Sequence, residues 1–258
     1  MKNINFTRAA IINFISLISL LNSAQLIAKS NSASSCVAHR GYSYKHLENS
    51  IEAILAAQAV GAHGIEFDVV HTKDGIPLVH HDETPYRTAR SKKGKNCKLD
   101  TPFAQQYFAQ LRENCELQNG EEIPSLEEVF NVMQDKPATL FVELKDSPSE
   151  QTLDLLNIDF HNKVVISYSS NDLDRVAQVH DEIPLILVTD HPVPVPDRFD
   201  GIGTQSLSDA QLRTLHSKGK IANIWTVNDS ASMHALANQG IDYITTDKIE
   251  LCLDEVGK

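Results

Sequence analysis

Short apolar runs and amphipathic segments take turns along the chain from residue 36 onward. The apolar runs have the length of strands, and the segments between them carry apolar residues at the spacing of a helix face. This pattern predicts strands that alternate with helices, with a helix start at Ser125 and a helix end at Gly219. Eight such strands are predicted, at 37–39, 65–70, 139–144, 164–168, 185–189, 201–203, 221–227 and 242–246.

The regularity of this alternation indicates the fold class. Strands and helices that alternate within one domain predict parallel pairing, and eight such units predict an α/β fold, a closed (β/α)₈ TIM barrel over 36–258. A doubly wound open sheet would need a glycine-rich phosphate loop after the first strand, and the sequence HRGYSYKH there is not one. The turn sequence TKDG at 72–75 predicts a hairpin. The polar stretch 85–122 predicts a small insertion after the second strand.

The first thirty residues follow another pattern. Lys2 and Arg8 precede the apolar run AAIINFISLISLLNSAQLIA, and the small, polar stretch KSNSASS follows it. This order is typical of a secretory signal peptide, which we assign to 1–30. Polar residues interrupt the apolar run, which favours cleavage over a retained membrane anchor. The mature protein is therefore expected to be exported, to a periplasm or the outside, without a stable membrane anchor.

Export would allow the four cysteines to form disulfides, because the compartments outside the cytoplasm are oxidising. Four cysteines allow three pairings, and the sequence alone does not choose among them. Cys97 and Cys115 lie in one polar segment and could staple it, whereas Cys36 and Cys252 would then tie the first strand to the last helix. Buried free thiols are the alternative, above all for the second pair.

Composition and charge exclude some classes of function. A hydrophobic content of 41% without low-complexity tracts is typical of an ordered globular protein, and 258 residues suit one large domain or two small ones. The formal net charge of −11 argues against a nucleic-acid-binding protein, which would need a basic face. The oligomeric state is left open, with a monomer as the default.

Acidic side chains stand at strand ends, where barrels of this kind carry their chemistry. Glu66 and Asp68 are two residues apart and so share one face of the second strand, and Glu143 and Lys145 repeat this spacing on the third. Three carboxylates without a cysteine suit one Ca²⁺ or Mg²⁺ better than zinc. Such a cation would also relieve their mutual repulsion. A structural ion network with Arg40 and Lys145 is the alternative interpretation.

Histidines are the candidates for proton transfer. His39 ends the first strand, and His80 and His81 follow the hairpin. Alternation sends His80 and His81 to opposite faces, so one of the two can join the site, and parity does not say which. One histidine could serve as general base and another as general acid. Arg40 and Lys145 suggest that the substrate carries an anionic group such as phosphate.

Several segments together resemble, in order, the signature of glycerophosphodiester phosphodiesterases. They are HRG at 39–41, ENS at 48–50, GIEFDV at 64–69, TKDG at 72–75, LVHHDETPYRT at 78–88, IPSLEEV at 123–129, FVELK at 141–145, WTVN at 225–228 and GIDYITTDK at 240–248. The resemblance implies a barrel that hydrolyses glycerophosphodiesters to glycerol phosphate and an alcohol. It further implies that His39 and His81 are the acid and base.

The resemblance also implies roles for the charged residues. Glu66, Asp68 and Glu143 would hold one divalent cation, and Arg40 and Lys145 would contact the phosphate of a small-molecule glycerophosphodiester.

Trp225, at the end of the seventh strand, is added to the expected substrate-binding residues. The segment 85–122 is shorter than the inserted subdomain of the family, so the resemblance carries least information about the alcohol. A lysophospholipase D-type activity on lysolipids is one alternative. A non-catalytic exported metal-binding protein is another, against which the intact histidines and acids argue.

Overall fold

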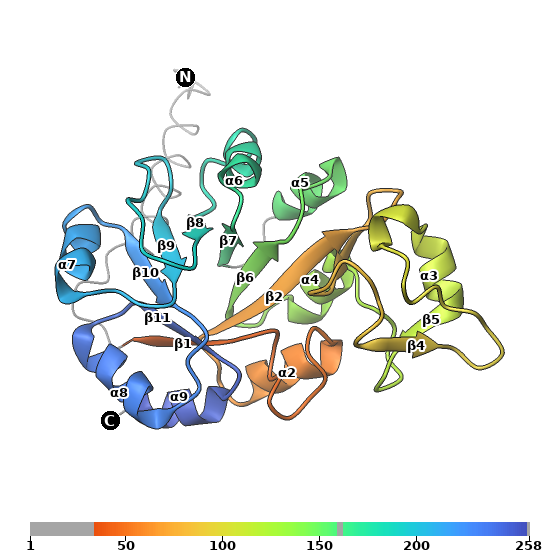
Figure 1. Cartoon of the computed structure of the whole chain (residues 1–258), viewed down its shortest axis with the longest axis horizontal. Coiled ribbons are helices and arrows are strands. Elements are labelled where there is room, and N and C mark those ends of the chain that lie inside the picture. The colour runs from red at the N-terminus through yellow and green to blue at the C-terminus, as the bar shows by residue number, and fades with distance from the viewer. Residues whose placement is uncertain (1–33, 159–161, 257–258) are drawn as a thin grey trace, which may run out of the picture.

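Eight parallel strands close into a barrel in the computed structural model, which describes residues 34–158 and 162–256 (Figure 1). In chain order the strands are β1 (Ser35–Ala38), β2 (Gly64–His71), β6 (Thr139–Leu144), β7 (Lys163–Ser167), β8 (Leu185–Val188), β9 (Gly201–Thr204), β10 (Ile221–Ile224) and β11 (Tyr243–Thr246). Each strand pairs with the next in parallel, and β1 pairs with both β2 and β11, which closes the ring. The predicted fold class is confirmed, as are all eight strands.

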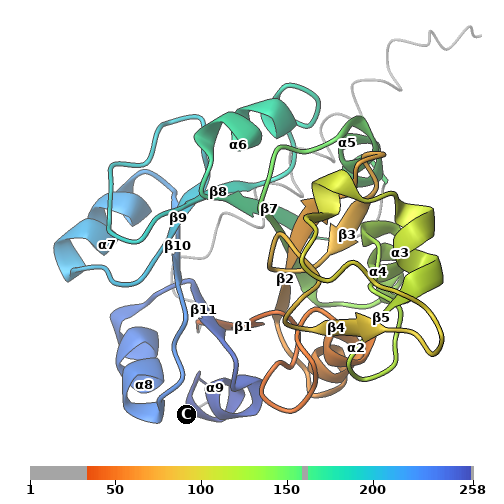
Figure 2. The same ribbon diagram turned by 45° about the vertical axis from the view of Figure 1, so that its right-hand side comes forward.

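Helices cover the outside of the barrel (Figure 2). They are α2 (Ile51–Ala59), α4 (Leu126–Met133), α5 (Glu150–Leu156), α6 (Ser170–Ala177), α7 (Asp209–Ser217), α8 (Ser230–Gln239) and α9 (Ile249–Val256). The predicted cap at Ser125 is confirmed: its side chain accepts from the backbone of Glu128, whose carboxylate accepts from the backbone of Ser125 in return. Beyond α7, Gly219 takes the left-handed conformation with φ +67°.

One connection lacks a helix. Between β8 and β9, the described segment 189–200 contains Pro192, Pro194 and Pro196 and forms none. A proline removes a backbone N–H and restricts the residue before it, so alternating prolines prevent a helix.

Strand alternation divides the core into two parts. Val37, Phe141 and Ile186 belong to one buried cluster within the barrel, whereas Ile65 and Phe67 belong to the larger cluster that includes the helices. Gly64 provides the space that the ring of Phe141 fills, since a Cβ there would lie 2.7 Å from that ring. The first, third and fifth positions of β2, which are Gly64, Glu66 and Asp68, therefore face inward, which aims both of its acids into the barrel.

The segment after β2 leaves the barrel wall. The strand β3 (Pro77–Val79) returns antiparallel to β2, as the hairpin pattern predicted, and Gly75 adopts φ +78° in the turn. An excursion over 85–122 then contains β4 (Ala89–Ser91), the 3₁₀ helix η1 (Phe103–Gln105), α3 (Phe108–Asn114) and β5 (Cys115–Leu117). Its small core is a separate buried cluster. Figure 2 shows it on one side of the barrel.

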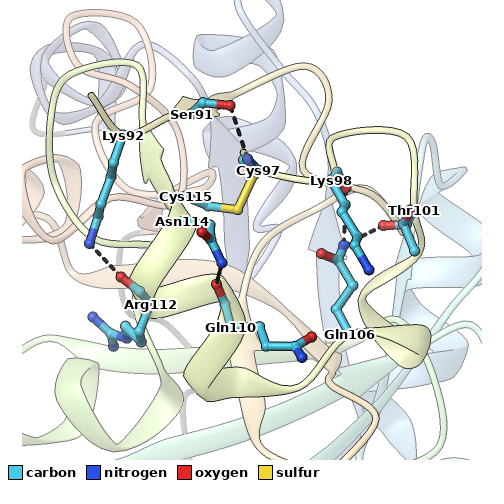
Figure 3. The surroundings of a disulfide bond; sticks show 10 residues. All are labelled: Ser91, Lys92, Cys97, Lys98, Thr101, Gln106, Gln110, Arg112, Asn114 and Cys115. Carbon is cyan, nitrogen blue, oxygen red and sulfur yellow. Dashed lines mark hydrogen bonds between the residues drawn. A yellow bond between two sulfur atoms is a disulfide. The ribbon is translucent and has the colours of Figure 1, made fainter. Parts of the chain in front are cut away.

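Two disulfides tie the chain together. Cys97 pairs with Cys115 within the excursion, beside the hydrogen bond from the backbone of Cys97 to the Ser91 hydroxyl (Figure 3). Cys36 pairs with Cys252 and joins β1 to α9. This is the pairing that the sequence suggested, and the alternative of buried free thiols is wrong.

Two predictions from the sequence concern the membrane. The predicted leader at 1–30 lies outside the described residues. Within 34–158 and 162–256, none of the helices has the length and apolar character needed to cross a bilayer.

The two disulfides should affect stability differently. Replacing Cys36 and Cys252 with alanine opens a closure of 216 residues and should lower the free energy of unfolding of the whole barrel by about 5 kcal/mol. Replacing Cys97 and Cys115 opens a closure of 18 residues, worth about 3 kcal/mol, and should act mainly on 85–122. Thermal unfolding and hydrogen exchange test this. Equal exchange in 85–122 for both double variants would contradict the assignment of separate roles.

Candidate active site

A pocket of about 120 Å³ opens at the carboxyl ends of the barrel strands. Seven of the eight predicted site residues line it: His39, Arg40, Glu66, His81, Glu143, Lys145 and Trp225. The eighth, Asp68, lies beside Glu66 and Glu143. Each of these three residues contributes one carboxylate oxygen to a cluster in which the oxygens lie within 4.8 Å of one another. A larger cavity of about 350 Å³, between α7 and the proline segment, contains none of the predicted residues.

The three carboxylate side chains are buried in and directly beside the lining of this pocket. Asp68 and Glu143 are register partners on the adjacent strands β2 and β6, and Glu66 and Asp68 are only 2% and 1% exposed. Burial raises the pKa of Glu66 well above its usual value, and the charges of Asp68 and Glu143 raise it further. Burial, and then the charge of Asp68, also raises the pKa of Glu143. Burial and mutual repulsion therefore favour the protonated, neutral forms of Glu66 and Glu143.

This donor set fits a divalent cation. Among the described residues, Glu66 Oε1 is a buried oxygen without a hydrogen-bond partner, which is costly unless something else satisfies it. All three groups offer hard oxygen atoms, the ligands that Ca²⁺ and Mg²⁺ prefer. Glu66, Asp68 and Glu143 can thus hold such an ion.

Two basic side chains border the acids. Lys145 Nζ lies 2.9 Å from Glu143 Oε1 and 3.6 Å from Asp68 Oδ1, and Arg40 Nε lies 3.4 Å from Asp68 Oδ2. The backbone N–H of Arg40 donates to Glu66 Oε2 at 2.8 Å, in a left-handed turn with φ +55°. The ion network that the sequence allowed as an alternative therefore exists beside the acidic cluster.

His39 has a carboxylate partner that the sequence did not reveal. Its Nδ1 lies 2.7 Å from Asp247 Oδ1, and Asp247 also accepts from Asn228 Nδ2 at 2.6 Å and from the Ser43 hydroxyl at 3.2 Å. Burial alone would raise the pKa of Asp247, but the hydrogen bonds from His39 and Asn228 lower it to about 2. The ionised carboxylate fixes the ring and leaves Nε2 as the nitrogen available to a ligand.

The neighbouring histidines separate as alternation requires. His81 lines the pocket, and its Nδ1 lies 2.7 Å from Asp82 Oδ1. His80 is 2% exposed and its Nε2 meets the Thr88 hydroxyl at 2.7 Å, while its ring packs edge-on to Phe103. The structure thus brings His81 to the site and gives His80 a place in the core of the excursion.

Other supporting residues went unnoticed in the sequence. Asn49 Nδ2 donates to Asp68 Oδ2 at 2.8 Å, and Glu48 accepts from Arg40 at 2.9 Å. Both belong to the ENS segment, whose polar letters were the available signal. Because neither follows a periodic pattern, their targets become visible only in the fold.

Part of the pocket lining is apolar or aromatic. Ile166 from β7 and Val188 from β8 line the pocket, and the Tyr168 and Trp225 rings meet at 75° with centroids 5.9 Å apart. The pocket therefore has an ionic half that suits a phosphate and an aromatic half that suits the carbon skeleton of a ligand.

Comparisons with known proteins agree with this arrangement. The model of the Glycerophosphoryl diester phosphodiesterase family matches residues 39–251. A glycerophosphodiester phosphodiesterase of Caldanaerobacter subterraneus is 29% identical, over 86% of this chain and 97% of the relative.

Two solved structures share the fold. A phosphodiesterase of Oleispira antarctica, solved with the product sn-glycerol-3-phosphate, has a TM-score of 0.74 at 23% identity and covers 88% of this chain and 98% of that one. A glycerophosphodiester phosphodiesterase of Thermotoga maritima has a TM-score of 0.69 at 25% identity, over 87% of this chain and 99% of that one.

The raised pKa of Glu66 gives a test of the acidic cluster. In metal-free protein, the stability associated with protonated Glu66 is complete below its ordinary pKa of 4.5 and is lost as the pH rises through the raised pKa. Glu66→Gln removes this titration, so under chelation the variant should match the wild type near pH 4 and melt higher at pH 8. Each kcal/mol corresponds to about 2–4 °C in melting temperature.

Adding Ca²⁺ or Mg²⁺ at pH 8 should reverse the order, because the wild type binds the ion with one more carboxylate. Glu127→Gln, at an exposed position of α4, is the matched control and should show neither effect. A melting-temperature difference that does not change with pH would contradict the coupling within the cluster.

Proposed function

The chain belongs to the glycerophosphoryl diester phosphodiesterase family, and from this premise we propose that it hydrolyses glycerophosphodiesters to glycerol phosphate and an alcohol. The observation that carries the proposal is the meeting of three buried carboxylates with two histidines, each paired with an aspartate, around one pocket. The product complex of the Oleispira relative supports a substrate of this kind.

The phosphate of the substrate would lie in the ionic half of the pocket. Arg40 and Lys145 would bind its non-bridging oxygens, and the guanidinium fork suits this geometry. Glu66, Asp68 and Glu143 would hold one Ca²⁺ or Mg²⁺, which supplies Lewis-acid polarisation of a phosphoryl oxygen when bound. Trp225 would contact the carbon skeleton from the aromatic part of the lining.

The two histidines would move the protons. One accepts a proton from the attacking hydroxyl group, of water or of the substrate's own glycerol, as the new P–O bond forms, and the other donates a proton to the alkoxide as the old P–O bond breaks. If the glycerol hydroxyl attacks, water then opens the cyclic phosphate to give glycerol phosphate. Asp247 and Asp82 hold the Nδ1 side of His39 and His81, so Nε2 of each ring is directed to this task.

The two disulfides support a further part of the proposal, the compartment. Disulfides persist where the environment is oxidising, and all four cysteines are paired. We propose that the protein works after export, in a periplasm or outside the cell.

The histidines can be tested one at a time. His39→Ala and His81→Ala should each lower kcat for glycerophosphocholine by roughly 10²–10⁴-fold, the usual worth of general acid–base catalysis. His234→Ala, at an exposed histidine on α8 (54% exposed side chain), should leave kcat unchanged. Thermal unfolding confirms that each variant is folded. Wild-type kcat in either pocket variant would remove that histidine from the mechanism.

Metal dependence can be tested on residues 30–258, which lack the leader. Glycerol phosphate release from glycerophosphocholine should stop after chelation and return with either Ca²⁺ or Mg²⁺, since hard oxygen ligands suit both ions. Activity that survives chelation would overturn the metal assignment. Activity on micellar lysophosphatidylcholine alone would instead favour the lysophospholipase D-type substrate.

A further inference from the structure

Arg87 lies between two carboxylates that each hold a residue of the pocket. Its Nε and one terminal nitrogen donate to Asp82 at 2.7 and 3.2 Å. Its two terminal nitrogens donate to Glu48 at 2.7 Å each. Asp82 is the partner of His81, and Glu48 is the partner of Arg40. One guanidinium thus connects the general acid–base side of the pocket with its phosphate-binding side.

These contacts form a chain of alternating charge. From the acidic cluster it runs through Arg40, Glu48, Arg87 and Asp82 to His81. Burial would raise the pKa of Glu48, but the hydrogen bonds from Arg87 and the charge of Arg40 lower it to about 2. An isolated pair at the surface contributes little, whereas a planar fork that engages two carboxylates at once fixes the direction of both.

Hydrogen bonds within the excursion hold the backbone of Arg87 in place. The side chain of Gln118 donates to the carbonyl of Arg87 at 2.8 Å, and the backbone of Gln118 donates to the carbonyl of Thr88 at 2.9 Å. Immediately beyond, β4 and β5 pair with Ser91 opposite Cys115, which carries the disulfide. A two-stranded sheet of β4 and β5, braced by the Cys97–Cys115 disulfide, therefore holds the backbone of Arg87 in place.

We propose that Arg87 is a positioning residue for the hydrolysis reaction. It directs Asp82 toward the Nδ1 side of His81 and Glu48 toward Arg40, so that the excursion contributes to proton transfer and phosphate binding without contacting the substrate. The inference rests on the proposed function for its kinetic consequences. Its structural consequence, the orientation of His81, does not depend on which phosphodiester is cleaved.

The main test is Arg87→Met, which keeps the length of the stem and removes the fork. Loss of a group that supports a site residue typically costs about 10–100-fold in activity, so kcat for glycerophosphocholine should fall by that factor and KM should rise. Arg87→Lys should recover only part of the loss, because a single ammonium cannot engage both carboxylates in the same way. Arg90→Met is the matched control, since Arg90 in the same excursion pairs with Glu116 at 2.8 Å.

A double-mutant cycle separates positioning from general stabilisation. If Arg87 acts through Asp82 and His81, Arg87→Met should lower the residual kcat of His81→Ala by less than about twofold, since coupled residues are non-additive. A purely structural role predicts the same loss in both backgrounds, together with a lower melting temperature. Either equal losses or wild-type kcat and KM in Arg87→Met would overturn the proposal.

A spectroscopic measurement keeps the inference separate from the proposed function. The low-field proton resonance of the His81 Nδ1–H, assigned by its loss in His81→Ala, should shift or broaden in Arg87→Met and stay in place in Arg90→Met. An unchanged resonance in Arg87→Met would refute the positioning role. Failure of the wild type to hydrolyse glycerophosphocholine would refute only the proposed substrate.

Discussion

The repulsion among three carboxylates buried within 4.8 Å of one another is the constraint around which the site is built. Buried charges of one sign are costly unless other groups compensate for them. Arg40 and Lys145 supply two positive charges beside the cluster, and Asn49 donates to Asp68. One oxygen of Glu66 still has no hydrogen-bond partner among the described residues, which is consistent with a cation-binding cluster.

The compensating groups in turn need partners of their own. Arg40 donates a hydrogen bond to Glu48, and Glu48 also accepts one from Arg87 in the excursion. The histidines follow the same rule, because each has an ionised aspartate on its Nδ1 side. Asp247 directly follows the last strand, and Asp82 lies between β3 and the excursion. The end of the last strand and the segment after β3 therefore supply the aspartate partners of the two pocket histidines.

The excursion is a structural element with its own small core and disulfide. It leaves the barrel after the β2–β3 hairpin with Arg87 near its start, and Gln118 on its returning side hydrogen-bonds the backbone there. Its residues are not part of the strand–helix repeat, and it reaches the pocket residues through the contacts of Arg87 with Asp82 and Glu48. Loops on a rigid scaffold commonly carry the features that distinguish relatives from one another.

The sequence by itself determined the features that depend on local periodicity. Spacing by two placed Glu66 and Asp68 on one face of a strand, and the strand–helix alternation predicted a barrel with eight strands, because both patterns are set within one element. The acidic cluster followed from the rule that parallel strands end at the same rim. The resemblance, and not the periodicity, chose His81 over His80.

Only the tertiary structure decided which distant residues meet. His39 and Asp247 are 208 positions apart, and Glu48 and Arg87 are 39 apart. No pattern along the chain encodes such pairs, because they depend on how the ring closes and where the excursion returns. The choice between His80 and His81 has the same origin. Both follow the end of β3, and the core of the excursion takes His80 and leaves His81 to the pocket.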